Sequence, residues 1–230
     1  MDKYTIVQRI ENFAPLDTQE PWDCSGWSVD CFGKDDISKV MLCLTVTENV
    51  VKQAHDNGCD IIISHHPLFF VPFEWCDINI YCAHTNMDLA YGGTTDMLID
   101  KLGFTNKKEQ ACNGFLRYVD LDISVLEFCK ILKMISPNMR YVNNRGVEYI
   151  HKIAFCAGSG AEFIQEAYNA GADAFVTGDL KFHIAVESPL VVFDIGHFES
   201  EVLVLPVFKK LVGDEVCVVY AKEQSPFLTT

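Results

Sequence analysis

The chain has 230 residues, of which 49% are hydrophobic, and a formal net charge of −14 at pH 7. This length and composition exclude a disordered chain and allow one large α/β domain or two small ones. The acidic balance argues against non-specific nucleic-acid binding, and no apolar run approaches the ~20 residues of a membrane span. Because the first residues lack the apolar core of a signal peptide, we expect a cytoplasmic protein.

The ten cysteines are scattered, and none form a Cys-x-x-Cys pair, so neither a zinc ribbon nor a thioredoxin motif is indicated. Several lie inside apolar patterns, among them Cys43, Cys129, Cys156 and Cys217. We interpret most of them as small buried hydrophobic residues in a reducing compartment. A disulfide framework is the less favoured alternative, because a chain of this length does not need one.

The first half of the chain alternates between helical and strand-like patterns. Apolar residues at helical spacing predict a first helix that Pro15 ends. Thr47 and Gly58 mark the start and the stop of a second helix. The expected helices are 3–14, 48–57 and 95–102, and the expected strands are 39–46, 61–63, 78–83 and 115–121.

The second half continues the alternation. Ser124 and Glu127 form a capping-box pattern ahead of an apolar helix. The polar segment 143–149 predicts a hairpin loop or a boundary. The expected helices are 125–135, 180–188 and 196–212, and the expected strands are 190–194 and 216–221.

The chain also repeats itself. Residues 40–60 align without a gap on residues 153–173, an offset of 113, and the matches include Cys43 with Cys156 and Gly58 with Gly171. Both copies predict a strand, a helix, Gly-x-Asp and a second strand. The repeat favours an internal duplication, with two like halves facing each other. We therefore expect an α/β fold of mixed sheets flanked by helices, with halves 1–120 and 121–230 that together form one compact unit.

Two histidines follow the most apolar strand. Ile61, Ile62 and Ile63 predict a short buried strand, and His65 and His66 stand at its exit. The carboxyl ends of strands in an open α/β sheet are where ligands bind, and histidine is the commonest metal ligand. The alternative is a pair of surface histidines in a turn.

Four strand exits supply polar groups of this kind. His197 and Glu201 lie four apart at a helix start, so both project from one face. Mixed nitrogen and carboxylate donors suit Zn²⁺, Mn²⁺ or Fe²⁺ rather than Ca²⁺. The donors exceed the needs of one zinc and fit two metals ~3.5–4 Å apart with a bridging carboxylate. The alternative is that single members merely cap the local backbone. The four pairs are His65/His66, His84/Asp88, Asp179/His183 and His197/Glu201.

Five segments together resemble the Nif-three-like family of dinuclear-metal proteins, also called GTP cyclohydrolase type 2 homologues. They are Trp22-Asp23…Gly26, Ser64-His-His-Pro67, His84-Thr-Asn-Met-Asp88, Thr177-Gly-Asp-Leu-Lys-Phe-His183 and Gly196-His-Phe-Glu-Ser-Glu201. The resemblance implies a duplicated α/β fold and a ring-shaped homohexamer whose metal sites face an inner cavity. It also implies two divalent ions, with Glu201 as a bridge and these ligands: His65, His66, Asp88, His197 and Glu201. We expect the five side chains to converge.

The chain departs from the family pattern at two places. The family usually has Asn-x-Gly-Leu after the Trp-Asp pair, where this chain has Cys24-Ser-Gly-Trp27. The first long strand of the family usually ends in Leu-Asp-x-Thr, where this chain has Leu44-Thr-Val-Thr47. Thr45 therefore lacks a carboxylate that could lie near the site.

The leading functional hypothesis is a metal-dependent hydrolase that acts on a nucleotide or a phosphoester. Two divalent ions would lower the pKa of a water and polarise a phosphoryl or ring-carbon electrophile. His84 and Asp179 are candidates to orient ligating imidazoles, and His183 and Glu201 are candidates for catalytic roles. The rival hypothesis is a non-catalytic metal-binding scaffold or regulatory interaction protein, whose ions hold the fold together.

Overall fold

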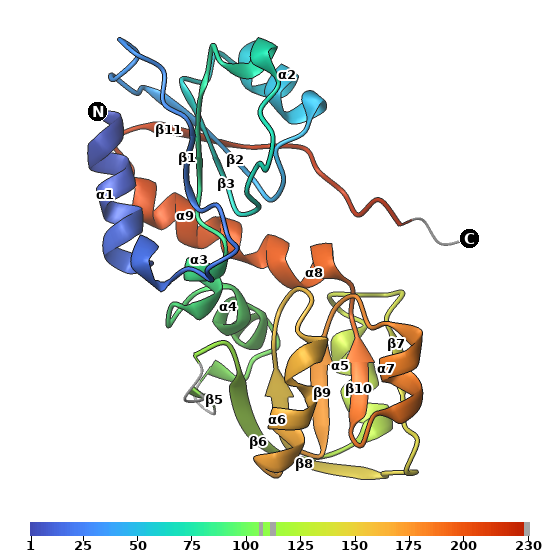
Figure 1. Ribbon diagram of the computed structural model, residues 1–230. Helices are drawn as coiled ribbons and strands as arrows, with labels where there is room; N and C mark the ends of the chain where they lie inside the picture. Colours follow the sequence, from blue (N-terminus) through green and yellow to red (C-terminus); the bar gives the residue numbers. More distant parts are fainter. Residues whose placement is uncertain (106–107, 111–113, 228–230) are drawn as a thin grey trace. The chain divides into compact units, whose positions relative to one another are not determined.

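The computed structural model describes residues 1–105, 108–110 and 114–227, which form two compact units (Figure 1). Unit 1 comprises Met1–Gly93 and Val204–Gln224. Unit 2 comprises Thr94–Leu203, together with the residues from Ser225 onwards. Among the described residues, no helix has the length and apolar character needed to cross a membrane.

Unit 1 is built on a five-stranded sheet in the order β1-β4-β3-β2-β11. The strands β4, β3, β2 and β11 run parallel, and β1 pairs antiparallel with β4 at the edge. The parallel strands are short and almost continuously apolar, as expected for strands that are covered on both faces. The strands are β1 (Gly26–Val29), β2 (Lys39–Cys43), β3 (Ile61–Ser64), β4 (Asn79–Cys82) and β11 (Cys217–Tyr220).

The helices of unit 1 begin at side-chain caps that the sequence carries. Asp2 accepts hydrogen bonds from the amides of the first turn of α1, and Thr47 accepts one from Val50 N at α2. Val50, Ala54 and their neighbours pack on β2 and β3. The helices are α1 (Lys3–Phe13), α2 (Glu48–Asp56), α3 (Thr85–Leu89) and α9 (Leu205–Val212), with 3-10 turns at Leu16–Thr18 and Phe73–Trp75.

Unit 2 contains a six-stranded mixed sheet in the order β5-β6-β8-β9-β10-β7. The central strands β8, β9 and β10 are parallel, while β5, β6 and β7 pair antiparallel with their neighbours. The strands are β5 (Lys108–Gln110), β6 (Arg117–Ser124), β7 (Arg140–Val142), β8 (Tyr149–Phe155), β9 (Ala174–Thr177) and β10 (Val191–Asp194).

The helices of unit 2 bury one aromatic cluster. Phe128 of α5 contacts Phe155 and Phe193 edge to face, with ring centroids 6.4 and 5.1 Å away. The predicted capping box of Ser124 and Glu127 is present at the start of α5. The helices are α4 (Thr94–Lys101), α5 (Val125–Leu132), α6 (Ile164–Asn169), α7 (Phe182–Glu187) and α8 (His197–Glu201), with a 3-10 turn at Ala161–Phe163.

The two units repeat one β-α-β motif in the same register. Val40 of β2 faces Ile61 of β3, and Ile153 of β8 faces Ala174 of β9, so both members of the pair shift by 113 residues. The repeat extends to the hydrogen bonds of one acid. Asp60 Oδ2 accepts from the amides of residues 38 and 39, at 2.8 and 2.9 Å.

Asp173 makes the corresponding pair of bonds in unit 2. Its Oδ2 accepts from the amides of residues 151 and 152, at 2.8 and 3.1 Å, again 113 residues further on. The carboxylate thus joins the first strand to the second at the same point in both copies. The duplicated α/β fold that the repeat predicts is confirmed.

The structure places the boundary between the units elsewhere than at the expected residues 120/121. Residues 94–120 belong to unit 2, because α4 and the strands β5 and β6 are part of it. Residues 204–224 return to unit 1, where β11 extends the sheet beside β2 and α9 packs on α1. Figure 1 shows the red β11 in the same unit as the blue strand β2, its partner in the sheet.

The helix expected over 196–212 is three pieces. The helix α8 ends at Glu201, a 3-10 turn covers Val202–Val204, and α9 starts at Leu205. Pro206 lies at the start of α9, and its missing backbone N–H prevents one continuous α-helical ladder. The sequence patterns also missed the edge strands β1, β5 and β7 and the short α3.

Cysteines within the described residues are free thiols, nine in all. Cys43, Cys129 and Cys156 are buried as predicted, while Cys217 is exposed on the edge strand β11. Burial raises the pKa of the Cys43 thiol well above its usual range. Cys112 lies outside the described residues.

Candidate metal centre

Three histidines meet at the carboxyl ends of β3 and β4. These strands are parallel neighbours, so His65 and His66 leave β3 beside the point where His84 leaves β4. Each of the three offers one ring nitrogen, and these atoms lie within 4.8 Å of one another. His65 is completely buried. Such a cluster of nitrogen donors could hold a metal ion.

Each of these rings is held at Nδ1. His65 Nδ1 lies 3.0 Å from the carbonyl oxygen of Ala83, and His84 Nδ1 lies 3.0 Å from Asp23 Oδ1. Carbonyl and carboxylate oxygens only accept hydrogen bonds, so both rings donate from Nδ1, and in a neutral ring Nε2 then carries the lone pair. Metal-ligating histidines are held in this way. His66 differs, because its Nδ1 lies 2.7 Å from the hydroxyl of Thr45.

Asp23 makes several hydrogen bonds at this site, although no role was predicted for it from the sequence. Its carboxylate accepts from His84, from the amide and hydroxyl of Thr85 at 3.0 and 2.5 Å, and from the hydroxyl of Ser25 at 3.0 Å. Burial alone would raise the pKa of Asp23, but the hydrogen bonds from His84 and Thr85 lower it far below its usual value. The only sequence signal was its place in the Trp22-Asp23 segment.

Asp88 lies one turn along α3 from His84, but it turns towards a different histidine. Its Oδ1 is 3.4 Å from Nε2 of His65. The predicted ligand Asp88 therefore lies next to the predicted ligand His65 within unit 1. A carboxylate beside an imidazole Nε2 is suited to share a cation with it.

In unit 2 the predicted ligands His197 and Glu201 contact each other. His197 Nε2 lies 2.8 Å from Glu201 Oε2, and its Nδ1 lies 2.8 Å from Asp179 Oδ2. Burial would lower the pKa of His197, but the two carboxylates raise it to about 9. Asp179 therefore orients a candidate ligand, as predicted for it.

Two glycines make room for this arrangement. A Cβ at Gly178 would come within 2.8 Å of the backbone nitrogen of His197, and a Cβ at Gly158 would come within 2.0 Å of Glu201 Oε1. Gly158 also has a φ of +68°, which side-chain-bearing residues rarely adopt. Both glycines let the backbone approach the donors closely, and the sequence analysis did not single them out for this.

The remaining candidate, His183, is exposed on α7. The structure thus groups the candidates into two sets, one in each unit, and His84 joins the donors of the first. The convergence of both sets on shared ions stays a prediction. The unit 1 set is His65, His66, His84 and Asp88. The unit 2 set is His197 and Glu201, with Asp179 behind His197.

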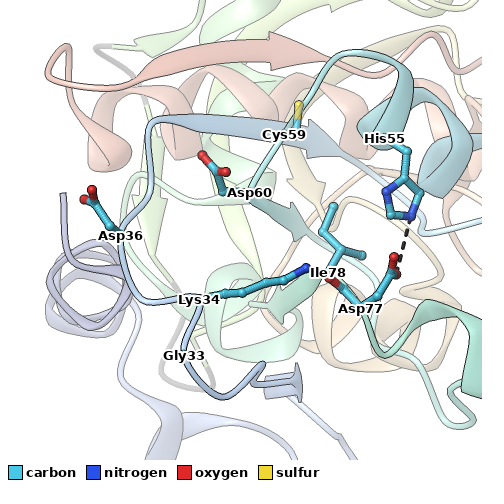
Figure 2. A pocket seen from close by; sticks show the side chains of 8 residues that line it. All are labelled: Gly33, Lys34, Asp36, His55, Cys59, Asp60, Asp77 and Ile78. Carbon is cyan, nitrogen blue, oxygen red and sulfur yellow. Dashed lines mark hydrogen bonds and ion pairs between the residues drawn. The ribbon is translucent and has the colours of Figure 1, made fainter.

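A cavity of about 360 Å³ lies at the amino ends of β3 and β4, at the opposite end of these strands from the three histidines (Figure 2). Lys34, Cys59 and Asp60 line it, as do His55 and Asp77, whose Nε2 and Oδ1 atoms lie 3.5 Å apart. It contains none of the predicted metal ligands. The candidate metal centre is therefore separate from this cavity.

The fold and these donor sets define a duplicated α/β protein with His and carboxylate groups that could hold metal. A family profile described as Duf34/NIF3 (NGG1p interacting factor 3) matches residues 1–75 and 75–226. The chain belongs to the Duf34/NIF3 family, which confirms the resemblance inferred from the five sequence segments.

Individual relatives agree along almost the whole chain. A Clostridium perfringens protein named GTP cyclohydrolase 1 type 2 homolog is 34% identical over 256 residues, covering 96% of this chain and 97% of the relative. NIF3-like protein 1 of Drosophila melanogaster is 27% identical over 260 residues, covering 97% of this chain and 88% of the relative.

Solved structures give the same fold. Reduced HcgD from Methanocaldococcus jannaschii superposes with a TM-score of 0.84 at 28% identity, covering 97% of this chain and 98% of that one. A Bacillus cereus protein related to NIF3 superposes with a TM-score of 0.86, covering 100% of this chain and 99% of that one. The latter is 19% identical and supports the fold alone.

Proposed function

We propose that this protein binds two divalent metal ions and hydrolyses a nucleotide or a phosphoester. The proposed ligands are the five that the sequence predicted: His65, His66, Asp88, His197 and Glu201. The observation that supports this most strongly is the orientation of the imidazoles. His65 and His197 each direct Nδ1 at a carbonyl or carboxylate acceptor and Nε2 at a carboxylate.

The residues fit divalent ions by their chemistry. Neutral imidazoles and carboxylates are donors for Zn²⁺, Mn²⁺ and Fe²⁺. His84 is an additional donor, because its ring nitrogen lies in the same cluster as those of His65 and His66. Bound divalent ions would supply Lewis acidity for attack on a phosphoryl group or a ring carbon. They would also reverse the local field of a chain with a net charge of −14, so that an anionic substrate can approach.

The chain's own residues would prepare this chemistry. Asp23 and Asp179 hold the protons on Nδ1 of His84 and His197, which keeps each Nε2 lone pair directed towards a cation. Gly158 leaves space for the Glu201 carboxylate, which is the proposed bridge. His183 remains a candidate acid or base on the exposed face of α7.

The name of the C. perfringens relative suggests ring opening of GTP as one reaction to test. We extend the proposal to a homohexamer in the cytoplasm, which the family resemblance supports. Light scattering of the purified protein would test the number of subunits. A monomer at working concentration would contradict the hexamer without affecting metal binding.

A metal-binding scaffold without catalysis is the second candidate function. It is favoured by the burial of the donors, because His65 is 0% and Glu201 is 3% exposed. Ions bound by such buried groups would stabilise the folded state directly. In this case chelation would lower the melting temperature, and no substrate would be turned over.

Turnover by wild-type protein loaded with metal separates these functions, and Glu201→Gln tests the proposed ligand set. We expect the variant to fold, to lose bound metal in elemental analysis, and to lose turnover on a panel of nucleotides and phosphoesters. Glu199→Gln, on the same helix, is the matched control and should keep both properties. Wild-type protein loaded with metal that turns over nothing on the panel would favour the scaffold. Unchanged metal content in Glu201→Gln would contradict the ligand set.

A further inference from the structure

The segment that follows β11, residues 221–223, is fastened along the edge of unit 1; we call it the C-terminal strap. Ala221 N donates to Leu42 O at 2.8 Å, which continues the pairing of β11 with β2. Lys222 N donates to Gln53 Oε1 at 2.8 Å, and Gln53 Nε2 donates back to Lys222 O at 3.3 Å. The amide side chain of α2 thus pairs with the strap as a neighbouring strand would.

Glu223 ends the strap on the turn that follows β2. Its Oε2 accepts from Leu44 N at 2.7 Å, and its Oε1 accepts from Thr45 N at 3.0 Å. Hydrogen bonds to a charged acceptor are about twice as strong as neutral ones. One carboxylate therefore fixes two consecutive amides at the place where the chain leaves the sheet. Burial raises the pKa of Glu223 although these bonds favour the ionised form.

The same turn holds His66 at two points. His66 N donates to Leu44 O at 2.8 Å, and His66 Nδ1 lies 2.7 Å from Thr45 Oγ1. The position of the imidazole therefore depends on the turn that Glu223 fixes. The hydroxyl of Thr45 can accept or donate, so it does not by itself choose the tautomer of the ring, whereas the acceptors of His65, His84 and His197 do.

We propose that Glu223 and Thr45 are positioning residues that set the orientation of His66 through the turn at residues 44–45. The strap supplies, from 178 residues away, the carboxylate that the turn itself lacks. The proposal extends the proposed function, because it matters for metal binding only if His66 is a ligand. Its direct consequence, the orientation and hydrogen bonding of the His66 ring, does not depend on any metal.

The first test uses metal-free protein and two-bond ¹H–¹⁵N spectra of the histidine rings, with His66 assigned from His66→Gln. We expect Thr45→Val to shift the His66 ring nitrogens strongly and Thr45→Ser to preserve them. Glu223→Ala should shift them, and Glu223→Gln should shift them less because its amide oxygen can still accept one bond. The signals of His151, which pairs with Asp122 in unit 2, should not move in any of these variants.

Glu215→Gln is the matched control, because Glu215 lies near β11 and pairs with Arg9 at 2.9 Å instead of contacting the turn. It should leave His66 unchanged. Circular dichroism verifies that each variant is folded, and Thr45→Val keeps the test decisive if Glu223→Ala unfolds. Unchanged His66 signals in both Thr45→Val and Glu223→Ala would overturn the proposal.

The second test measures the Kd for Mn²⁺ by calorimetry. Loss of an orienting partner typically weakens metal binding about 10- to 100-fold, which we expect for Thr45→Val and Glu223→Ala but not for Glu215→Gln. If His66→Gln itself binds Mn²⁺ as tightly as wild type, the proposed ligand set is wrong, while a shifted His66 ring in Glu223→Ala still supports the strap. The two failures are therefore distinguishable.

Discussion

Unit 1 and unit 2 carry the same helix-borne pair and use it differently. His84 and Asp88 in unit 1 correspond to His197 and Glu201 in unit 2 at the offset of 113 residues that relates the repeats. In unit 2 the two members of the pair contact each other, with 2.8 Å between His197 Nε2 and Glu201 Oε2. In unit 1 the shorter Asp88 contacts His65 at 3.4 Å.

The strand exits explain the difference. His65 and His66 leave β3 in unit 1, whereas the equivalent positions after β9 are Gly178 and Asp179. Gly178 has no space for a side chain, and Asp179 orients His197. Duplication has thus kept the donor-bearing helix in both copies. Only unit 1 supplies donors from the strand as well, so the two copies provide unequal donor sets.

The largest expected effect is a loss of stability when a buried ion pair in unit 2 is broken. Arg117 Nε donates to Asp96 Oδ2 at 2.8 Å, and neither side chain is exposed. Asp96→Asn should lower the free energy of unfolding by about 3–5 kcal/mol, because it removes the charge of one partner from a buried ion pair. Urea unfolding followed by circular dichroism measures this loss.

The buried cation of unit 1 is its control. Lys3 Nζ lies 2.6 Å from Asp30 and 2.8 Å from Asp35, whose side chains are 39% and 53% exposed. Asp35→Asn should cost less than about 1 kcal/mol, since Asp30 and water still serve the ammonium. Equal losses in the two variants would contradict the distinction.

Gly158 in unit 2 is the equivalent of Thr45 in unit 1 at the repeat offset. Adding a side chain at residue 158 tests whether this position in unit 2 must be glycine. Gly158→Ala adds backbone strain and a Cβ 2.0 Å from Glu201 Oε1, so it should displace that carboxylate and lower both stability and metal content. Gly146→Ala has nearly the same φ, +66°, with nothing within 4 Å. It should cost only the strain, about 1–2 kcal/mol, and keep the metal. Equal metal contents in the two variants would contradict the prediction.

The orienting carboxylates should each contribute to metal affinity. Asp23→Asn and Asp179→Asn keep the side-chain shape but remove the charge that holds Nδ1–H, so each should weaken Mn²⁺ binding about 10- to 100-fold in calorimetry. The exposed pair of His151 and Asp122, 3.3 Å apart, gives the control Asp122→Asn. If the control weakens binding equally, general charge loss rather than orientation is the cause.

The smallest effect is a titration. In metal-free protein we expect a pKa of about 9 for His197 by NMR, above its ordinary 6.5. Because the folded pKa is raised, the charged pair stabilises the fold fully below pH 6.5 and ceases to do so as the pH rises through 9. Glu201→Gln should lower this pKa by removing one of the two carboxylates. A pKa near 6.5 in wild type would contradict the described contacts.

Much of the fold could be predicted from local sequence. Apolar periodicity and caps such as Thr47 and Ser124 place most helices and central strands, because these signals act within a few residues. The edge strands β1, β5 and β7 are short and were not predicted, since their pairing depends on distant partners. Residues around Pro206 formed three helical pieces for a reason that the sequence displayed but the prediction did not use.

The sequence by itself determined the duplicated α/β class, the candidate ligands and the family, because each depends on residue identity and on spacing along the chain. Only the tertiary structure decided which partner orients each imidazole. Asp23 reaches His84 across 61 residues, and Glu223 reaches Thr45 across 178. Hydrogen bonds form between atoms that folding brings within about 3 Å, and that proximity is not written in the spacing of the chain.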